Sequence, residues 1–333
     1  MSKSKQRNPS IDVFRYICAI LVIAIHTGPF KEINESLGFI VTDIIPRVAV
    51  PFFFIVSGYF YVCKLQNGEK PLWNSIKRLL IVYSLWSIFY YLIQYIQWGY
   101  YNPKGFAINC VVSFIFYGSS YHFWFFPALI FALCFTTLLW KMRYQKIIIP
   151  LSIILYIIGV LGCAYYNLCR GLPLLSKLFE HELFTAIRRI LLMGFPFFAG
   201  GYLVLSVENV INKRQSLLMW IVSLTVWIIE IVIVIQNRYQ RNVIITFGLY
   251  PFVIFTFIVL LKNPLQRFVS IAGTCRQLAN FAYYSHPALI MVIEVLINRI
   301  SSTGMFLLVT VASTALGLVI CKCNNPLLNE LIR

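Results

Sequence analysis

The chain has 333 residues, of which 60% are hydrophobic, 17% aromatic and only 12% charged. A soluble domain carries about 25% charged residues, and a disordered chain is rich in charge and poor in apolar side chains, so this composition excludes both classes. The formal net charge of +17 invites a nucleic-acid interpretation, but the basic residues stand between apolar blocks and do not line one face. The sequence therefore predicts an all-α integral membrane protein that binds no nucleic acid.

Ten segments are long and apolar enough to cross the bilayer as helices, since about 20 residues rising about 1.5 Å each span its roughly 30 Å of hydrocarbon. They are 11–29, 46–63, 79–98, 122–140, 147–166, 184–205, 217–235, 243–261, 278–297 and 305–321. The run 106–118 is shorter, so we interpret it as a re-entrant or interfacial helix. The sequence has no internal repeat of 20–50 residues and no clear linker, which predicts one helical bundle over 1–333.

The basic residues orient these spans. An even number of spans places both termini on one side of the membrane. When alternate connections are assigned to that side, starting at the amino terminus, it carries 17 Lys and Arg residues and the opposite side carries 7. Cytoplasmic connections hold the excess of basic residues in membrane proteins. We therefore expect a protein of the plasma membrane with both termini in the cytoplasm. We also expect the first span to be a membrane helix and not a cleaved signal peptide.

The first span contains three ionisable residues, which are costly in hydrocarbon and hence candidates for function. Asp12 and Arg15 are three residues apart and can form an ion pair, or can simply extend to the headgroups near the cytoplasmic boundary. Eleven residues separate Arg15 from His26, which is within roughly 20° of three full helical turns. The two side chains thus share one helical face, about 16 Å apart along the axis.

The second span carries a basic residue at its outer end and small residues further along. Arg47 is placed to hold an anionic or carbonyl group. Ser57 and Gly58 follow a run of three phenylalanines that is bulky enough to shape a cavity. The alternative for Ser57 and Gly58 is close packing against another helix, which small residues permit.

Later spans add further polar groups. His122 begins the fourth span beside Trp124 and is either functional or part of an interfacial aromatic belt. Glu230 in the seventh span can neutralise one of the arginines that open the sixth, Arg188 and Arg189. His286 stands about halfway along the ninth span, and Pro287 after it frees a backbone carbonyl one turn earlier.

Several common kinds of site are missing from the sequence. It contains no motif for nucleotide hydrolysis, dinucleotide binding, zincins or serine hydrolases. The nine cysteines are scattered, mostly within apolar runs, which predicts neither a zinc site nor disulfides, and we expect no metal and no covalently bound cofactor. Imidazole, guanidinium and carboxylate groups within spans point to group transfer across the membrane or to transport of a small solute.

The motifs resemble those of the acyltransferase family 3 membrane proteins. The resemblance is carried by Arg15 and His26 with ten residues between them, RVAVPFFFIVSGY from Arg47, YHFWFF around His122, and YYSHP around His286. These motifs cover nearly the whole chain in order. The runs RVAVPFFFIVSGYF and YHFWFFPALI look most similar to the membrane domain of VanT-type serine racemases of vancomycin resistance.

The resemblance implies a bacterial membrane enzyme that moves an acyl group, usually acetyl, from cytoplasmic acetyl-CoA to an acceptor at the outer face. The acceptor would be a hydroxyl or amino group, in cell-wall (peptidoglycan) modification or glycopeptide resistance. On this reading His26 is the acid/base residue, Arg15 with Asp12 binds the donor, and Arg47, Ser57 and His122 shape the acceptor or acyl passage. Glu230 and His286 are further candidates for residues that line this passage.

The similarity to serine racemases implies an alternative, in which the membrane domain supplies L-serine to an attached racemase. Arg47 or Arg15 would then meet the serine carboxylate and Glu230 its ammonium group. In such proteins a cytoplasmic pyridoxal-phosphate racemase domain follows the membrane domain, and we expect this chain to hold only the membrane part. A third possibility, a purely structural anchor, leaves the polar groups in the spans without a purpose.

Overall fold

The computed structural model describes residues 8–97, 99–181, 183–297 and 299–323, and it is helical throughout, with no strand in those ranges. Its α-helices are α1 Pro9–Thr27, α2 Glu35–Phe39, α3 Ala49–Gln66, α4 Leu72–Gln97, α5 Pro103–Val112, α6 Phe125–Lys141, α7 Gln145–Leu161, α8 Tyr166–Cys169, α9 Pro173–Glu180, α10 Phe184–Ile187, α11 Phe195–Val207, α12 Lys213–Gln236, α13 Leu249–Lys262, α14 Val269–Leu296 and α15 Ser302–Lys322. Three π-helical segments, η1 Ile40–Ile44, η4 Ser113–Tyr117 and η5 Arg188–Gly194, and a 3₁₀ turn, η2 Ile45–Val48, adjoin them. The expectation of an all-α protein is confirmed.

All ten predicted segments contain a helix, but fewer pass a test of length and hydropathy. Six helical stretches in the described ranges are long and apolar enough to cross a membrane, or up to seven if the bent pair α13 and α14 counts as one span. Helices α6 and α7 have 17 residues each, and α13 and α14 are bent by 85° at a short break. The protein is thus a multi-pass helical membrane protein, and the count of ten spans stays a prediction.

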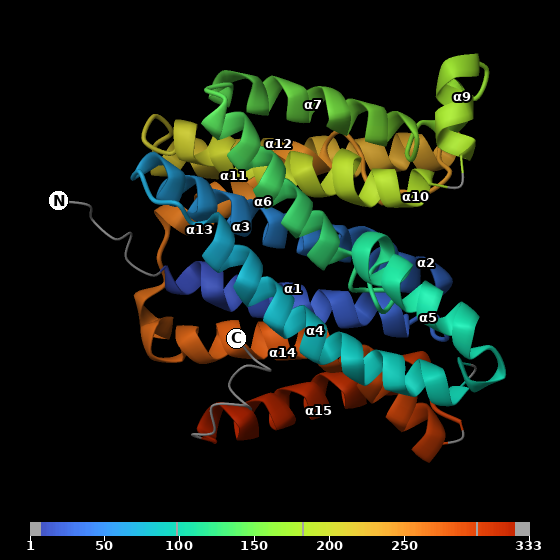
Figure 1. Ribbon diagram of the computed structural model, residues 1–333. Helices are drawn as coiled ribbons and strands as arrows, with labels where there is room; N and C mark the ends of the chain where they lie inside the picture. The colour runs from blue at the N-terminus through green and yellow to red at the C-terminus, as the bar shows by residue number, and fades with distance from the viewer. Residues whose placement is uncertain (1–7, 98, 182, 298, 324–333) are drawn as a thin grey trace. The chain divides into compact units, whose positions relative to one another are not determined.

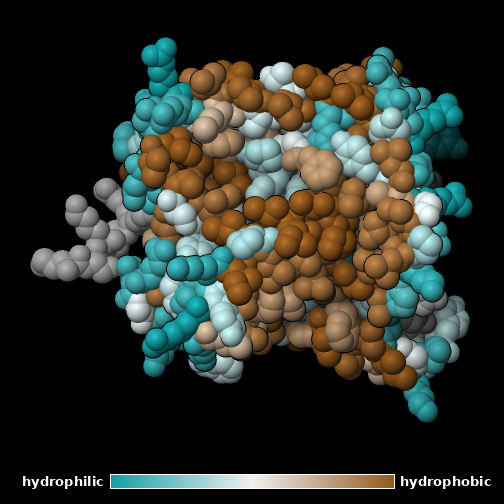
Figure 2. Space-filling model, turned by 90° about the horizontal axis from the view of Figure 1, so that it is seen from above, coloured by the Kyte–Doolittle hydropathy of each residue, from teal (hydrophilic) through white to brown (hydrophobic). Residues whose placement is uncertain are grey.

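The apolar surface agrees with a membrane environment. Helix α12 exposes Leu218, Val222 and Ile229, and α15 exposes Leu307, Val311 and Val319. Figure 2 shows one face of the molecule, on which hydrophobic side chains (brown) gather across the middle of the view and hydrophilic ones (teal) at its left and right edges. Large exposed apolar patches are rare on soluble monomers, so lipid is the environment that these faces fit.

The chain divides into two compact units. The first consists of Met1–Phe53, Asn212–Trp220 and Phe255–Arg333, and the second of Phe54–Ile211 and Ile221–Ile254. Three of the four boundaries fall within α3, α12 and α13, and the fourth lies just before α12. Each unit has its own buried side chains and is described separately.

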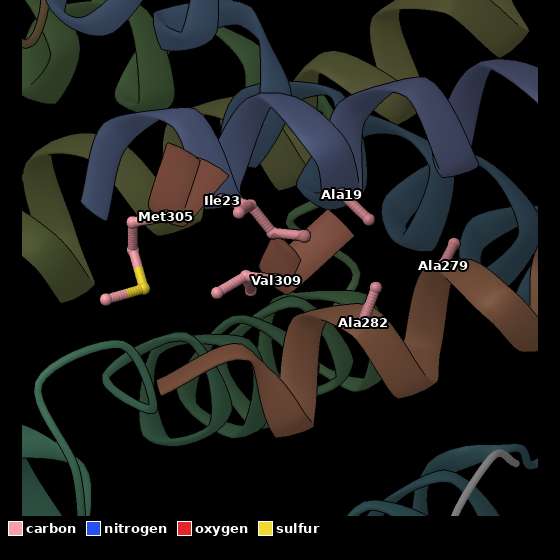
Figure 3. Close-up of a cluster of buried hydrophobic side chains, with 6 residues drawn as sticks. All are labelled: Ala19, Ile23, Ala279, Ala282, Met305 and Val309. Atoms are coloured by element: carbon pink, nitrogen blue, oxygen red, sulfur yellow. The ribbon is translucent and has the colours of Figure 1, made fainter. Parts of the chain in front are cut away.

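In the first unit, α1, α14 and α15 lie side by side (Figure 1). Six buried side chains from these helices point toward one another (Figure 3): Ala19, Ile23, Ala279, Ala282, Met305 and Val309. Three of the six are alanines, which let helix backbones approach closely where lipid supplies no hydrophobic driving force. This packing brings the start of the chain against a helix about 260 residues later.

Polar contacts at both ends of α1 fix its position within the first unit. Asn8 caps its own helix through Ser10 N and donates from Nδ2 to Leu260 O at 3.0 Å, at the end of α13. Gly28 ends the helix in the left-handed conformation that glycine adopts readily, with φ of 66°. After it, Glu32 accepts from Thr303 N at 2.8 Å and from the Ser302 hydroxyl at the start of α15, and these hydrogen bonds lower the pKa of Glu32 to about 2.

In the second unit, α3 crosses α11 at unusually short range. A methyl group added at Gly58 would lie 1.9 Å from Phe198 O, and one at Gly201 would lie 2.2 Å from Tyr59 N. Beside this crossing, the Tyr59 hydroxyl donates to Glu208 Oε2 at 2.6 Å. The crossing depends on both glycines, which confirms the packing interpretation for Gly58.

Candidate functional site

Helix α1 carries the site's first three residues along one unbroken α-helix, as the spacing predicts. Because the helix is continuous from Arg15 to His26, the two residues lie on one helical face, as their separation of eleven residues predicts. The Arg15 guanidinium lies 3.9 Å from Asp12 Oδ1, and Asp12 is buried. Asp12 therefore holds Arg15 near the amino-terminal end of α1, on the same helical face as His26.

His26 meets His286 from α14, a contact that sequence alone did not indicate. The two imidazole rings stack with centroids 5.2 Å apart and planes 22° from parallel. His286 is completely buried, whereas His26 is exposed. His286 is thus the buried member of the pair, on α14, and His26 is the member at the end of α1.

The hydrogen bonds of His286 determine which of its ring nitrogens carries the proton. Its Nδ1 lies 2.9 Å from Tyr283 O and 3.1 Å from Ala282 O, and carbonyl oxygens only accept hydrogen bonds. In a regular helix Tyr283 O would receive the N–H of the residue at position 287, but Pro287 has none. The carbonyl that Pro287 frees is therefore used by His286, whose Nδ1 is protonated and whose Nε2 is left as an acceptor.

Arg47 completes the group in the first unit. It lies in η2, which packs against α1, the helix that carries His26. Its Nε donates to Asp43 O and its Nη2 to Asp43 Oδ1, both at 2.8 Å, and Lys31 Nζ lies 3.6 Å from the same carboxylate. Asp43 was missed by the sequence analysis, although an Asp four residues before an Arg is a recognisable helical pair.

The remaining candidates lie in the second unit and are described without reference to the first. Ser57 is half-buried in α3. His122 is buried, and its ring centroid lies 4.0 Å from that of Phe123 and 5.5 Å from that of Tyr90. Helix α6 begins only at Phe125, because Gly118 with φ of 89° and the turn after it interrupt the helix. His122 thus precedes the helix that it was expected to begin.

Glu230 holds a loop and does not pair with an arginine. Its carboxylate accepts from Phe247 N at 2.7 Å, Gly248 N at 2.6 Å and the Tyr165 hydroxyl at 3.1 Å. It thereby satisfies backbone donors at the start of α13, which begins at Leu249 and not at 243 as expected. Among the described residues Glu230 forms no ion pair, so the expected neutralisation of Arg188 or Arg189 is not made.

No group of three or more His, Cys, Asp or Glu side chains in the described ranges is arranged to hold a metal ion. The first unit holds an imidazole pair, His26 and His286, and the guanidinium of Arg47. A neutral imidazole accepts a proton, and a guanidinium stabilises negative charge on oxygen.

The fold and this site define a multi-pass helical membrane protein that holds a stacked pair of imidazoles. The model of the acyltransferase domain family matches residues 8–322, and the chain belongs to this family.

Relatives of the chain carry racemase names. It is 34% identical over 197 residues to an amino-acid racemase of Enterococcus faecalis, covering 58% of this chain and 27% of the relative. It is 35% identical over 176 residues to a serine/alanine racemase of Enterococcus gallinarum, covering 50% and 25%. The match thus spans about a quarter of the length of these relatives. No solved structure gives a significant match.

Proposed function

We propose that the protein is a membrane-embedded acyltransferase module that uses His26 as its general base. It takes an acyl group, such as acetyl, from a cytoplasmic acyl-CoA and transfers it to a hydroxyl or amino acceptor at the outer face of a bacterial cell membrane. The observation that carries the proposal is the stacking of the His26 ring, at the end of α1, on the buried ring of His286. Ten spans with both termini in the cytoplasm are part of the same proposal.

The reaction follows from these groups. A ring nitrogen of His26 accepts the proton of the acceptor hydroxyl while the hydroxyl oxygen attacks the thioester carbonyl carbon. Arg47, fixed by Asp43, stabilises the negative charge on the carbonyl oxygen of the tetrahedral intermediate. When the intermediate collapses, the carbon–sulfur bond breaks and the leaving thiolate takes the proton from His26. Arg15, held by Asp12, binds the anionic donor nearer the cytoplasm, about 16 Å along α1.

The test is an assay of the full chain in lipid nanodiscs with acetyl-CoA and hydroxyl acceptors, measuring released CoA by chromatography. A positioned general base contributes about 10²- to 10⁴-fold, so His26→Ala should lower the rate at least about a hundredfold while the melting temperature changes little. His181→Ala is the matched control, because His181 is exposed in a connecting loop. The proposal fails if the wild-type protein neither transfers nor hydrolyses the acyl group and CoA leaves its melting temperature unchanged.

A second function is supported by the relatives' names. Proteins called amino-acid racemase and serine/alanine racemase are similar to this chain over about half of its length, which favours a module that delivers L-serine to a racemase domain. Arg47 would then meet the carboxylate of serine. Proteoliposomes that contain the protein should take up labelled L-serine faster than empty vesicles, and equal uptake would remove this alternative.

A further inference from the structure

Arg188, Arg241 and Asn242 lie around one buried thiol in the second unit. Cys163, just after the end of α7, is completely buried. Arg188 at the start of η5 approaches its sulfur with Nη1 at 4.0 Å. Arg241, in the loop before α13, donates its backbone N–H to Cys163 O at 2.9 Å, and its guanidinium and the side chain of Asn242 also act on the thiol. Helix α7, η5 and the α12–α13 loop thus meet at this point.

The arginines of this cluster contact neutral partners in the part of the chain that the structure describes. Neither Arg188 nor Arg241 forms an ion pair with any carboxylate in the ranges that the structure describes. Arg241 donates from Nη1 to Phe179 O at 3.0 Å and stacks over the Tyr166 ring at 5.4 Å, both neutral partners. The nearby acid, Glu230, already accepts three hydrogen bonds from Tyr165 and the backbone.

The thiol itself cannot play the part of a counter-ion. A neutral thiol is a weak acceptor, whereas guanidinium groups in proteins stay charged at every accessible pH. Arg188 lies in a stretch, Phe184–Val207, that is apolar enough to span a membrane, where an ionisable side chain marks a functional site by default. The π-helical turn that starts at Arg188 is also a feature found frequently at functional sites.

Both guanidinium groups remain within reach of a ligand. Arg188 is half-buried and Arg241 is exposed, so the cluster opens to its surroundings although Cys163 is sealed beneath it. The planar fork of a guanidinium matches the oxygens of a carboxylate or a phosphate group. An oxyanion is therefore the ligand whose chemistry fits two uncompensated arginines and one amide.

We propose that Arg188, Arg241 and Asn242 form a binding site for the oxyanion group, carboxylate or phosphate, of a small ligand. The site lies wholly within the second unit and does not depend on the roles of His26 and Arg47. It serves any function in which the ligand is anionic, so it goes beyond the proposed acyl transfer and survives if that function is wrong.

The test measures anion binding to the purified full chain in detergent by isothermal titration calorimetry, with inorganic phosphate and L-serine as separate probes and chloride at equal ionic strength as reference. We expect phosphate or L-serine to bind where chloride does not. Tight phosphate binding alone assigns a phosphorylated ligand, and L-serine binding assigns an amino-acid carboxylate. Since a hydrogen bond to a charged group contributes about 1.5–3 kcal/mol, Arg188→Gln and Arg241→Gln should each weaken binding about tenfold or more.

Arg170→Gln is the charge-matched control, because Arg170 is exposed and has no part in the Cys163 cluster. It should bind the anion as the wild-type protein does. If Arg188→Gln fails to fold, Arg241→Gln decides the matter, with its melting temperature measured alongside because Arg241 also contacts Phe179 O and the Tyr166 ring. Equal heats with chloride and both oxyanions, or unchanged affinity in Arg241→Gln, would overturn the assignment.

Discussion

His286 and Pro287 are sequence neighbours that act on the same carbonyl. Pro287 withholds an N–H from Tyr283 O, and His286 supplies one from Nδ1 at 2.9 Å. The histidine is thereby held in one tautomer with Nε2 as an acceptor, beneath the ring of His26. His286 touches no reacting atom in the proposed mechanism, so it acts as a positioning residue for His26.

This arrangement predicts opposite effects of Pro287→Ala on stability and activity. The alanine N–H competes with His286 Nδ1 for Tyr283 O, and the loss of one hydrogen bond of about 0.5–1.5 kcal/mol should lower kcat by up to about tenfold with little change in KM. Proline in a helix interior costs about 3 kcal/mol, so the variant should melt at a higher temperature. Steady-state kinetics over a pH series together with thermal unfolding measure both effects.

Pro150→Ala is the matched control, because Pro150 also lies inside a helix, α7, and its position has no ionisable partner in the mechanism. It should raise the melting temperature and leave kcat and the pH profile unchanged. A Pro287→Ala variant that keeps the wild-type kcat and pH profile would show that the freed carbonyl does not position His286 for activity.

The sequence was sufficient for some of these residues and not for others. Spacing along one helix predicted the Asp12–Arg15 pair and the common face of Arg15 and His26, because helix geometry is local. The stacking of His26 on His286 joins residues 260 positions apart and depends on which helices are neighbours. Glu230 was expected to pair with an arginine, but it accepts hydrogen bonds from the backbone N–H groups of a loop. No local sequence pattern predicts the conformation of that loop.

At the scale of the elements, hydropathy located the helices better than it located their ends. Helix α14 begins at Val269, well before the expected 278, because its first turns carry polar residues that lower the local hydropathy without breaking the helix. Helix α13 begins later than expected, since the residues before Leu249 form the loop held by Glu230. Hydropathy reports what lipid tolerates, whereas helix ends depend on caps and on tertiary hydrogen bonds.

The crossing of α3 and α11 gives a prediction at this scale. Gly58→Ala should destabilise the fold, because its methyl group would lie 1.9 Å from Phe198 O, a backbone atom that can move only with the helix. Forcing extra volume into a packed contact costs typically about 1–3 kcal/mol, and backbone involvement puts this variant at the upper end. Thermal or denaturant unfolding of the purified variant in detergent measures the change.

Gly273→Ala in α14 provides the comparison, since a methyl group there would meet no atom within 4 Å. Alanine is favoured over glycine in a helix by up to about 1 kcal/mol, so this variant should be neutral or slightly more stable. If Gly58→Ala were as stable as Gly273→Ala, the close approach of α3 and α11 would not exist in the folded protein.

At the scale of the whole molecule, composition was enough to predict a helical membrane protein. It could not predict which helices are neighbours. Lipid tails are as apolar as leucine, so a helix shows a similar pattern of residues whether lipid or another helix covers it. The contact between α1 and α14 is marked in the sequence only by the small residues Ala19, Ala279 and Ala282. Alanine is common in any apolar helix, so these residues do not predict the contact. Residue pattern thus predicts spans and orientation, while the pairing of helices requires the folded chain.

The number of spans leads to a prediction about the two chain ends. Ten spans, or any even number, would put both termini on one side, and the excess of 17 over 7 basic residues predicts that this side is the cytoplasm. Seven spans, the most that length and hydropathy alone support in the described ranges, would put the termini on opposite sides.

Reporter fusions at the two ends of the chain test the prediction of cytoplasmic termini. Green fluorescent protein fused to either end should fluoresce, because it folds in the cytoplasm, and alkaline phosphatase fused to the same ends should be inactive. Alkaline phosphatase fused after Asn34, in the first predicted outer connection, should be active and serves as the positive control. An active phosphatase at the carboxyl terminus would make the number of spans odd and exclude the count of ten.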